Sequence, residues 1–293
     1  MRIAVVGAGT MGAGIAYAAA VGGIEVALYD ADPAGLERGL ARARADLDGA
    51  VARGKVEPAQ ADAAAARLRP ARSLAAAVDR VDAVIEAIAE DMDAKQALFR
   101  QVDALAPGAL LATNTSALSV TQIMAVLEDP GRGLGMHFFN PVRAMRLCEL
   151  VLGVQTRPDS VERAEALARA MGKETVRVAD VAGFATSRIN AVIGNEAFFM
   201  LSEGVATAED IDTAVRLGLN HPMGPLEMAD LVGLDVRLAV LGELRRSLGE
   251  KYRPAPLMEK LVRAGRLGRK TGQGVYRYDA EGRREPGSAE GLR

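Results

Sequence analysis

The first twelve residues constrain the fold more than any other part of the sequence. A short apolar run, Arg2 to Val6, leads directly into Gly7-Ala8-Gly9-Thr10-Met11-Gly12, and a helical stretch follows from Ala13. In a strand-turn-helix unit, the first glycine permits the tight turn, the second lets the backbone approach a pyrophosphate, and the third allows close helix packing. The helix N-terminus adds a partial positive charge for the phosphates. The pattern therefore predicts a dinucleotide-binding α/β domain.

An acidic residue follows the glycines at the distance that a dinucleotide site requires. The second apolar run, Glu25 to Tyr29, is followed by Asp30. A carboxylate about 20 positions after the glycines suits the ribose 2′-hydroxyl of NAD. It would repel the 2′-phosphate of NADP, and no arginine occurs within Ala31-Asp32-Pro33. We therefore expect NAD as the cofactor.

The rest of the first half alternates short apolar runs with longer helical segments, which is typical of a parallel sheet with crossover helices. After Val181-Ala182-Gly183 the strand-like runs stop. We expect a Rossmann-like NAD-binding domain with a mainly parallel sheet over residues 1–182, followed by an all-α domain over residues 183–293. The predicted strands are 2–6, 25–29, 83–87, 109–113, 134–137, 147–152 and 175–178. The predicted helices of the second domain are 189–201, 208–217 and 236–248, with Thr207 and Asp210 as a variant capping box.

Composition excludes several classes of function. The formal net charge is -2, with positive and negative residues interspersed, so the chain lacks the basic field that nucleic-acid binding requires. The single cysteine, Cys148, allows no internal disulfide and fits a reducing compartment. The chain shows no basic leader, and no apolar stretch approaches the roughly 20 residues that span a bilayer. We therefore expect a cytoplasmic protein with a small-molecule partner and no metal.

One of only two histidines stands close to an isolated carboxylate. His137 begins the run His137-Phe138-Phe139-Asn140-Pro141, and Glu149 follows inside the apolar run Leu147 to Leu152. An imidazole titrates near neutral pH, and a carboxylate beside it fixes its tautomer and stabilises its cation. The pair predicts a proton acceptor for the oxidation of an alcohol to a ketone. The alternatives are a buried structural histidine and a surface glutamate on an edge strand; His221, in a turn rich in proline and glycine, is expected to be structural.

Seven segments carry a resemblance to a known family in the same order along the chain: GAGTMGAGI, IEAIAEDMDAK, TNTSALS, HFFNPV, CELV, GFATSRI and GRLGRKTGQGVY. The chain resembles the short-chain L-3-hydroxyacyl-CoA dehydrogenases, particularly their 3-hydroxybutyryl-CoA branch. The resemblance implies a Rossmann-like NAD-binding domain and a helical domain that carries the interface of a homodimer. It also implies reversible oxidation of a 3-hydroxyacyl-CoA to the 3-ketoacyl-CoA with NAD, in fatty acid or butanoate metabolism.

The resemblance also assigns roles to individual residues. It implies His137 as the catalytic base and Glu149 as its partner, while the hydroxyl of Ser116 would hold the substrate oxygen. Asn140 would contact the cofactor and arrange the loop after His137, with simple Asn-Pro turn chemistry as the alternative. The implied cofactor contacts are Gly7, Gly9, Thr10, Met11, Gly12, Asp30, Glu90, Lys95, Asn114, Ser116, Asn140 and Lys270.

The resemblance implies that polar and basic residues between the second and third predicted strands bind coenzyme A. Arg53 and Lys55 stand in the matching stretch, and phosphate groups suit their charges. Two positions depart from the family pattern. Asp46 stands where some relatives have serine, and an acid does not suit a phosphate. Ser187, expected near the thioester, stands where many relatives have a longer asparagine.

Two rival functions remain at this point. An enzyme of the same fold could act on another hydroxy acid, such as a hydroxyadipyl-CoA or a free sugar acid. A non-catalytic dinucleotide-binding protein would keep the glycines and Asp30 but would not need the pair of His137 and Glu149. The β-hydroxyacid dehydrogenases with a catalytic lysine match less well, because no lysine occurs in the helix that opens near Phe184.

Overall fold

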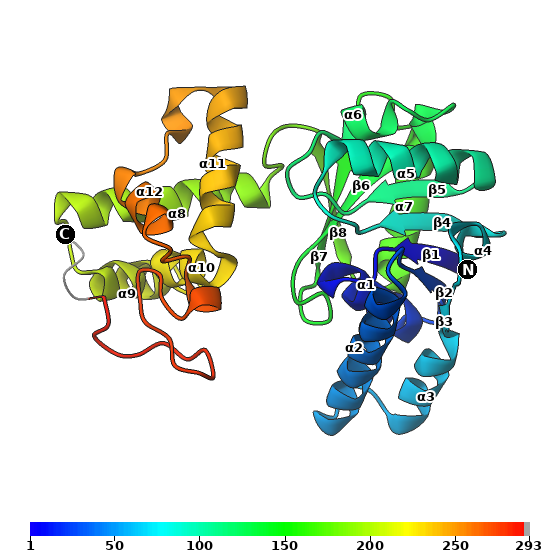
Figure 1. Cartoon of the computed structure of the whole chain (residues 1–293), viewed down its shortest axis with the longest axis horizontal. Coiled ribbons are helices and arrows are strands. Elements are labelled where there is room, and N and C mark those ends of the chain that lie inside the picture. Colours follow the sequence, from blue (N-terminus) through cyan, green and yellow to red (C-terminus); the bar gives the residue numbers. More distant parts are fainter. Residues whose placement is uncertain (290–293) are drawn as a thin grey trace. The chain divides into compact units, whose positions relative to one another are not determined.

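The computed structural model describes residues 1–289 and forms two compact units, of which the first ends at Val181 and the second begins at Ala182. The boundary lies one residue before the predicted one. The first unit carries the sheet, and the second is built from helices and a long C-terminal loop (Figure 1). Among residues 1–289, no helix combines the length and the apolar character needed to cross a membrane.

The first unit contains an eight-stranded sheet in the order β3-β2-β1-β4-β5-β6-β7-β8. All neighbouring strands run parallel except β6 and β7, which pair antiparallel. This arrangement confirms the predicted Rossmann-like domain with a mainly parallel sheet. The strands are β1 (Arg2–Val6), β2 (Glu25–Tyr29), β3 (Leu68–Pro70), β4 (Ala83–Glu86), β5 (Leu110–Thr113), β6 (Gly133–Phe138), β7 (Leu147–Leu152) and β8 (Glu174–Ala179).

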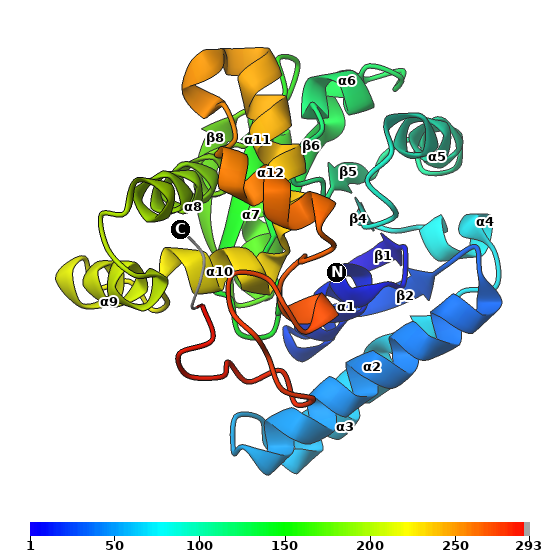
Figure 2. The same ribbon diagram turned by 60° about the vertical axis from the view of Figure 1, so that its left-hand side comes forward.

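Near-continuous apolar runs form the central strands because both faces of a parallel sheet are buried. In β1, Ile3 to Val6 are all buried, and so is every residue of β4, β5 and β6. The helices α1, α2 and α3 contact one another, and α5 contacts α4 and α6; Figure 2 shows α2 and α3 side by side. The helices are α1 (Thr10–Val21), α2 (Pro33–Ala52), α3 (Pro58–Arg67), α4 (Leu74–Val78), α5 (Met92–Leu105), α6 (Val120–Met124) and α7 (Pro158–Ala170), with a 3-10 turn η1 (Pro130–Arg132).

The second unit packs its helices around a separate apolar core that includes Phe198, Leu226, Leu241 and Tyr276. Its helical character confirms the prediction for this part of the chain. The helices are α8 (Thr186–Glu203), α9 (Ala208–Gly218), α10 (Pro225–Val232), α11 (Leu234–Leu248) and α12 (Pro256–Arg263), with 3-10 turns η2 (Glu250–Tyr252) and η3 (Arg269–Thr271).

Thr207 caps α9 as its spacing to Asp210 predicts. The Thr207 hydroxyl accepts a hydrogen bond from the Asp210 amide at 3.1 Å, which satisfies one of the open backbone donors of the first turn. The same hydroxyl donates to the Asp210 carboxylate at 2.8 Å. The acid therefore holds the cap side chain in place.

Two buried aspartates anchor the C-terminal loop to the helices of this unit. Asp230 in α10 accepts hydrogen bonds from the amides of Val275 and Tyr276, each at 2.9 Å, and from the Tyr278 hydroxyl at 3.1 Å. Asp212 in α9 accepts the Tyr276 hydroxyl at 2.8 Å. Burial raises the pKa of Asp230 to about 6, because the low-dielectric surroundings disfavour its charged form more than these donors stabilise it.

Candidate active site

The glycine turn after β1 is closely packed at Gly7 and Gly12 and open at Gly9, where a dinucleotide could approach the backbone. A Cβ atom on Gly7 would lie 2.6 Å from the Ala87 carbonyl oxygen, and one on Gly12 would lie 1.7 Å from the Gly7 carbonyl oxygen. Gly7 also has a φ of +97°, which a side chain would strain. A Cβ on Gly9 would meet nothing within 4 Å, so this residue faces open space at the start of α1. These residues fit a pyrophosphate bound at a helix N-terminus.

Asp30 closes the same turn from the end of β2. Its carboxylate accepts hydrogen bonds from the Ala8 amide at 2.7 Å and from the Asp32 amide at 2.9 Å. A cavity of about 610 Å³ lies beside it, and Gly7, Gly9 and Asp30 are among the residues that line it. The acid is therefore held at the edge of the cavity, where a ribose 2′-hydroxyl could reach it.

Two arginines near Asp30 were not anticipated from the sequence. Arg38 and Arg42 in α2 line a second cavity of about 270 Å³, together with Gly9 and Asp30. Arg42 donates to the Thr10 hydroxyl at 2.9 Å, and Arg38 donates to Asp32 at 3.0 Å. The three residues directly after Asp30 contain no arginine, and Arg38 and Arg42 lie further on, within α2. The spacing of four residues along the following helix is the signal that would have found this pair.

His137 and Glu149 form a buried pair across two antiparallel strands. The residues are direct partners in the register of β6 and β7, and His137 Nδ1 lies 2.8 Å from Glu149 Oε2. His137 is 5% exposed and Glu149 is 0% exposed. The alternative of a surface glutamate on an edge strand is wrong, because β7 lies between β6 and β8. A carboxylate at Nδ1 selects the neutral tautomer whose lone pair is on Nε2.

The loop after β5 lies beside the end of the strand that carries His137. Parallel strands β4, β5 and β6 end at the same edge of the sheet, which is where open α/β sheets bind ligands. The Asn114 side chain accepts a hydrogen bond from the Phe138 amide at 2.9 Å. Ser116, two residues further on, is exposed. The fold therefore brings Asn114, Ser116 and His137 to one edge of the first unit.

Glu90 contacts this loop directly, and Lys95 contacts Glu90. Glu90 accepts the Thr115 hydroxyl and the amides of Ser116, at 2.8 Å, and Ala117, at 3.1 Å. Lys95 is 1% exposed, and its Nζ lies 3.3 Å from Glu90 Oε2 and 2.6 Å from Glu86 Oε1. Glu86 was missed in the sequence because it stands inside a predicted strand. A charged residue near the carboxyl end of an apolar strand is the available signal.

Three further predicted site residues of the first unit, Asn140, Arg53 and Lys55, are exposed. Asn140 is exposed just after β6 and precedes Pro141 through a cis peptide bond. Arg53 and Lys55 are exposed at and beyond the end of α2. Asp46, the departure noted in the sequence, pairs with Arg143 Nε at 2.9 Å, so its charge is offset by the loop after β6.

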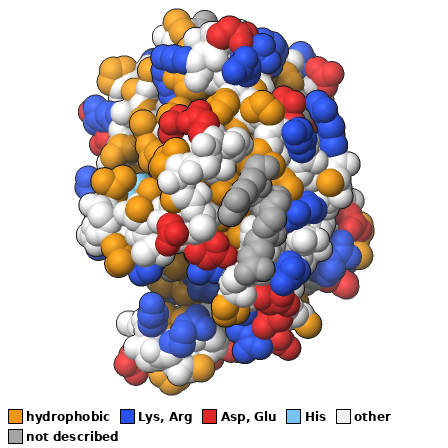
Figure 3. All heavy atoms as spheres, turned by 90° about the vertical axis from the view of Figure 1, so that its left-hand side faces the viewer, with side chains coloured by type: hydrophobic (Ala, Val, Ile, Leu, Met, Phe, Trp, Pro, Cys, Tyr) orange, Lys and Arg blue, Asp and Glu red, His pale blue; other side chains and the backbone are white. Residues whose placement is uncertain are grey.

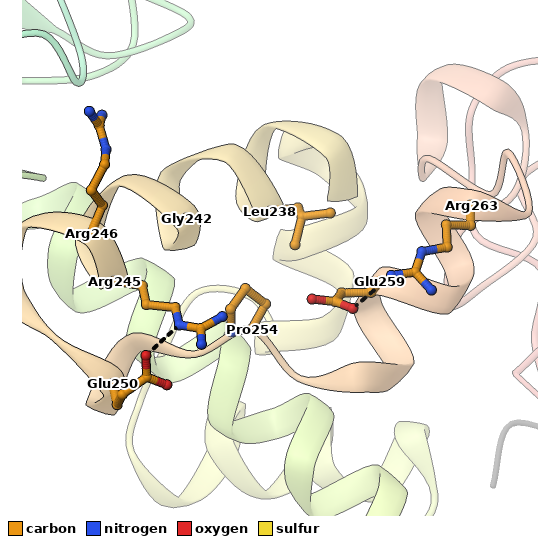
Figure 4. A pocket seen from close by; sticks show the side chains of 8 residues that line it. All are labelled: Leu238, Gly242, Arg245, Arg246, Glu250, Pro254, Glu259 and Arg263. Carbon is orange, nitrogen blue, oxygen red and sulfur yellow. Dashed lines mark hydrogen bonds and ion pairs between the residues drawn. The ribbon is translucent and has the colours of Figure 1, made fainter.

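The second unit carries two of the predicted site residues. Ser187 is the second residue of α8. Lys270 lies in η3, and its Nζ is 2.6 Å from an Asp235 carboxylate oxygen. His221 lines an apolar cavity of about 430 Å³ with Met223 and Met228. A further cavity of about 550 Å³ is lined by Arg245, Arg246 and Arg263, and each of them is paired with a glutamate. Figure 4 shows the pairs of Arg245 with Glu250 and of Arg263 with Glu259.

Comparison with known proteins connects both units to one family. The 3-hydroxyacyl-CoA dehydrogenase NAD-binding domain matches residues 2–181, and the C-terminal domain of the same family matches residues 183–278. The chain belongs to the 3-hydroxyacyl-CoA dehydrogenase family. This confirms the resemblance of its motifs, and it establishes an NAD-dependent oxidoreductase with NAD as cofactor.

Individual relatives of this family cover nearly the whole chain. A protein of Bacillus subtilis named as a probable 3-hydroxybutyryl-CoA dehydrogenase is 44% identical over 280 residues, which is 95% of this chain and 97% of that protein. The crystal structure of a Ralstonia eutropha (S)-3-hydroxybutyryl-CoA dehydrogenase has a TM-score of 0.92 at 42% identity and covers 95% of this chain and 99% of that one. A 3-hydroxyadipyl-CoA dehydrogenase of Escherichia coli is 41% identical and covers 95% of this chain and 59% of that protein.

Proposed function

We propose that this enzyme oxidises (3S)-3-hydroxyacyl-CoA esters, and 3-hydroxybutyryl-CoA in particular, to the 3-ketoacyl-CoA. The observation that carries the proposal is the buried pair of His137 and Glu149, with a 2.8 Å contact at Nδ1. The loop that bears Asn114 and Ser116 lies at the same edge of the sheet. The relatives named as 3-hydroxybutyryl-CoA dehydrogenases support the choice of substrate.

His137 acts as the base in this proposal. Its Nε2 removes the proton of the substrate 3-hydroxyl group, and the resulting imidazolium is stabilised by Glu149 through Nδ1. Proton removal raises the electron density on the oxygen and weakens the adjacent C–H bond. The bound NAD supplies the acceptor for the hydride that leaves this carbon. Because Glu149 is fully buried, little solvent screens its charge.

Ser116 and Asn140 assist the same step from the two neighbouring loops. Ser116 is exposed at the end of β5, where its hydroxyl can donate to the substrate oxygen. Asn140 follows β6 by two residues and can contact the cofactor beside His137. Arg53 and Lys55 bind phosphates of coenzyme A, since both are exposed cations at the end of α2. Ser187 and Lys270 keep the roles that the family resemblance implies, at the thioester and at the cofactor.

The substrate assignment is tested by oxidation of NADH with the purified protein. Acetoacetyl-CoA is compared with free acetoacetate and with 3-ketoadipyl-CoA. NADPH replaces NADH in a parallel series. We expect rapid oxidation only with a CoA ester and NADH. A preference for the dicarboxylic ester would assign the enzyme to hydroxyadipyl-CoA instead, and turnover of the free acid would contradict the role of coenzyme A. NADH binding without any turnover would indicate a non-catalytic dinucleotide-binding protein.

We also propose that two copies associate through the second unit. Ile189 and Val192 in α8 and Leu217 in α9 are large apolar side chains that stay exposed, Leu217 at 69%. Figure 3 shows hydrophobic side chains in patches among the charged ones on the face turned to the viewer. Where exposed apolar side chains join into a large continuous patch, the patch marks a protein–protein interface. A second copy that covers them would form the homodimer that the family resemblance implies.

Sedimentation velocity tests this association. Ile189→Glu places a charge on the exposed face of α8, and we expect it to shift the protein from dimer to monomer. Val154→Glu is the matched control, because Val154 is 87% exposed in the first unit. A monomeric wild type, or a dimer that tolerates Ile189→Glu, would remove α8 from the interface.

A further inference from the structure

Three charged residues in contact with one another, Glu86, Lys95 and Glu90, support the loop that carries Ser116. Glu86, the last residue of β4, is 0% exposed. Its carboxylate accepts three hydrogen bonds, from Lys95 Nζ at 2.6 Å, from the Thr113 hydroxyl at 2.6 Å and from the Ile88 amide at 2.7 Å. These donors come from α5, from the end of β5 and from the chain just after β4. Glu86 therefore joins three segments at the carboxyl edge of the sheet.

Lys95 links Glu86 to Glu90, because its ammonium group forms an ion pair with each of them. Its ammonium group is 1% exposed, and it lies between Glu86 and Glu90, at 2.6 and 3.3 Å. A buried cation without an opposite charge costs several kcal/mol, so the position of this ammonium is determined by the carboxylates around it. Glu90 is 40% exposed in its side chain and could turn toward solvent. Lys95 holds it against the protein.

Glu90 in turn fixes the loop after β5. One of its oxygens takes the Thr115 hydroxyl and the amides of Ser116 and Ala117. The beginning of the loop is held separately, because the Asn114 amide donates to the Glu86 carbonyl oxygen at 2.8 Å. The Asn114 side chain accepts the amide of Phe138, next to His137. Hydrogen bonds therefore hold the loop to β6, the strand that carries His137, through Asn114, and to Glu90 through residues 115–117.

We propose that Glu86 is a positioning residue for the dehydrogenation: through Lys95 and Glu90 it fixes residues 114–117 so that Ser116 faces the substrate oxygen held at His137. The inference rests on the proposed function. Glu86 acts through other residues and does not touch the substrate itself. An apolar pair of similar volume would pack equally well at the positions of Glu86 and Lys95, and ion pairs of this kind contribute little net stability. What the charged pair adds is a defined location for Glu90.

The variant Glu86→Gln tests this role against a matched control. Glutamine keeps the size of the side chain but removes the charge that holds Lys95. Asp103→Asn removes the charge from a second ion pair, that of the partly buried Asp103 with the buried Arg132. Asp103 lies in α5, eight residues after Lys95. Both changes are expected to lower stability. Only Glu86→Gln should lower kcat with acetoacetyl-CoA, by about 10 to 100-fold, because small displacements of a positioning group have effects of that size.

Hydrogen exchange of the peptide covering residues 114–118 supplies a readout that needs no substrate. We expect its exchange to accelerate in Glu86→Gln and to stay at the wild-type rate in Asp103→Asn. The double variant Glu86→Gln/Lys95→Met removes the buried cation that has lost its Glu86 partner, and it should recover stability while exchange in this peptide stays fast. Wild-type exchange in either variant with the Glu86 change would overturn the proposal. If the wild type itself fails to reduce acetoacetyl-CoA, the proposed function fails, and the exchange comparison still decides whether Glu86 fixes the loop.

Discussion

The buried carboxylates of the two units are held in different ways. In the first unit, Glu86 and Glu149 are both fully buried, and each faces a buried cationic or basic partner, Lys95 at 2.6 Å and His137 at 2.8 Å. In the second unit, Asp230 and Asp212 are held mainly by backbone amides and tyrosine hydroxyls. The one ion pair of Asp212 among the described residues, with Arg284, spans 3.8 Å.

The difference separates two roles of a buried carboxylate. In the first unit the carboxylate faces a charged or basic partner, whereas in the second unit it joins segments of the chain through neutral hydrogen-bond donors. A carboxylate held by neutral donors loses more through burial than it gains, which is why the pKa values of Asp230 and Asp212 are raised, that of Asp230 to about 6. Such a group is suited to joining segments of the chain. A carboxylate that must stabilise an imidazolium during turnover needs the opposite charge at close range. We therefore expect substitutions in the first unit to change activity more than stability, and substitutions in the second to do the reverse.

His137→Gln should have the largest effect. Without the base, the substrate proton has no acceptor at this position, and turnover should fall by about two to four powers of ten. NADH binding, measured by fluorescence, should stay within about threefold of wild type, because the glycine turn and Asp30 are untouched. Turnover near the wild-type rate would show that another group accepts the proton. A parallel loss of NADH binding would place His137 in the cofactor site.

Asp230→Asn should act on stability, in a way that depends on pH. The folded protein binds a proton at Asp230 more tightly than the unfolded chain does, since the pKa rises from 3.8 to about 6. This contribution is complete below pH 3.8 and is lost as the pH rises through about 6. The free energy of unfolding of wild type relative to Asp230→Asn should therefore fall by about 2.4 kcal/mol between pH 4 and pH 7.5.

Denaturant unfolding at the two pH values measures this difference. Asp62→Asn is the control, because Asp62 is exposed in α3, and its difference from wild type should stay nearly constant. An equal pH dependence for both variants would show that burial does not perturb Asp230. The turnover of Asp230→Asn, measured where the variant is fully folded, should remain close to wild type.

Local patterns predicted the first unit better than the second. The bounds of β1, β2 and β7 agree with the predicted strands, because alternating glycine turns and apolar runs mark them clearly. The strand β3 was missed, since it has only three residues and contains Pro70. In the second unit, α10 and α12 were not predicted. Each has eight residues and begins at a proline, so neither repeats an apolar spacing often enough to stand out.

The candidate site was predictable where it resides in motifs and unpredictable where it depends on long-range contacts. His137 and Glu149 lie twelve residues apart on neighbouring strands, and the sequence pattern places them together. The contacts of Asp230 with the C-terminal loop join residues 45 or more positions apart, which no local pattern encodes. Glu86 was concealed for a different reason, because strand assignment by hydrophobicity passes over a single charge at the end of a run.

Asp30→Ala should change cofactor choice in the first unit. The carboxylate favours a 2′-hydroxyl, and its removal leaves Arg38 and Arg42 on the same cavity, where a 2′-phosphate would meet positive charge. We expect the ratio of kcat/KM for NADH to that for NADPH to fall at least about tenfold, or about 1.4 kcal/mol. The ratio cancels any general loss from the missing hydrogen bonds to Ala8 and Asp32. An unchanged ratio would remove Asp30 from cofactor selection.

Thr207→Ala should give the smallest effect. It tests whether a substitution in the second unit changes stability without changing activity. Its hydroxyl caps α9 by accepting the Asp210 amide at 3.1 Å, and loss of such a cap costs about 1 kcal/mol. Thr207→Ser keeps the hydroxyl and should restore most of that stability, so the pair separates capping from packing of the methyl group. Neither variant should change kcat, because Thr207 belongs to a helix end of the second unit. A fall in kcat with unchanged stability would reverse the expected order, and it would mean that α9 takes part in the chemistry.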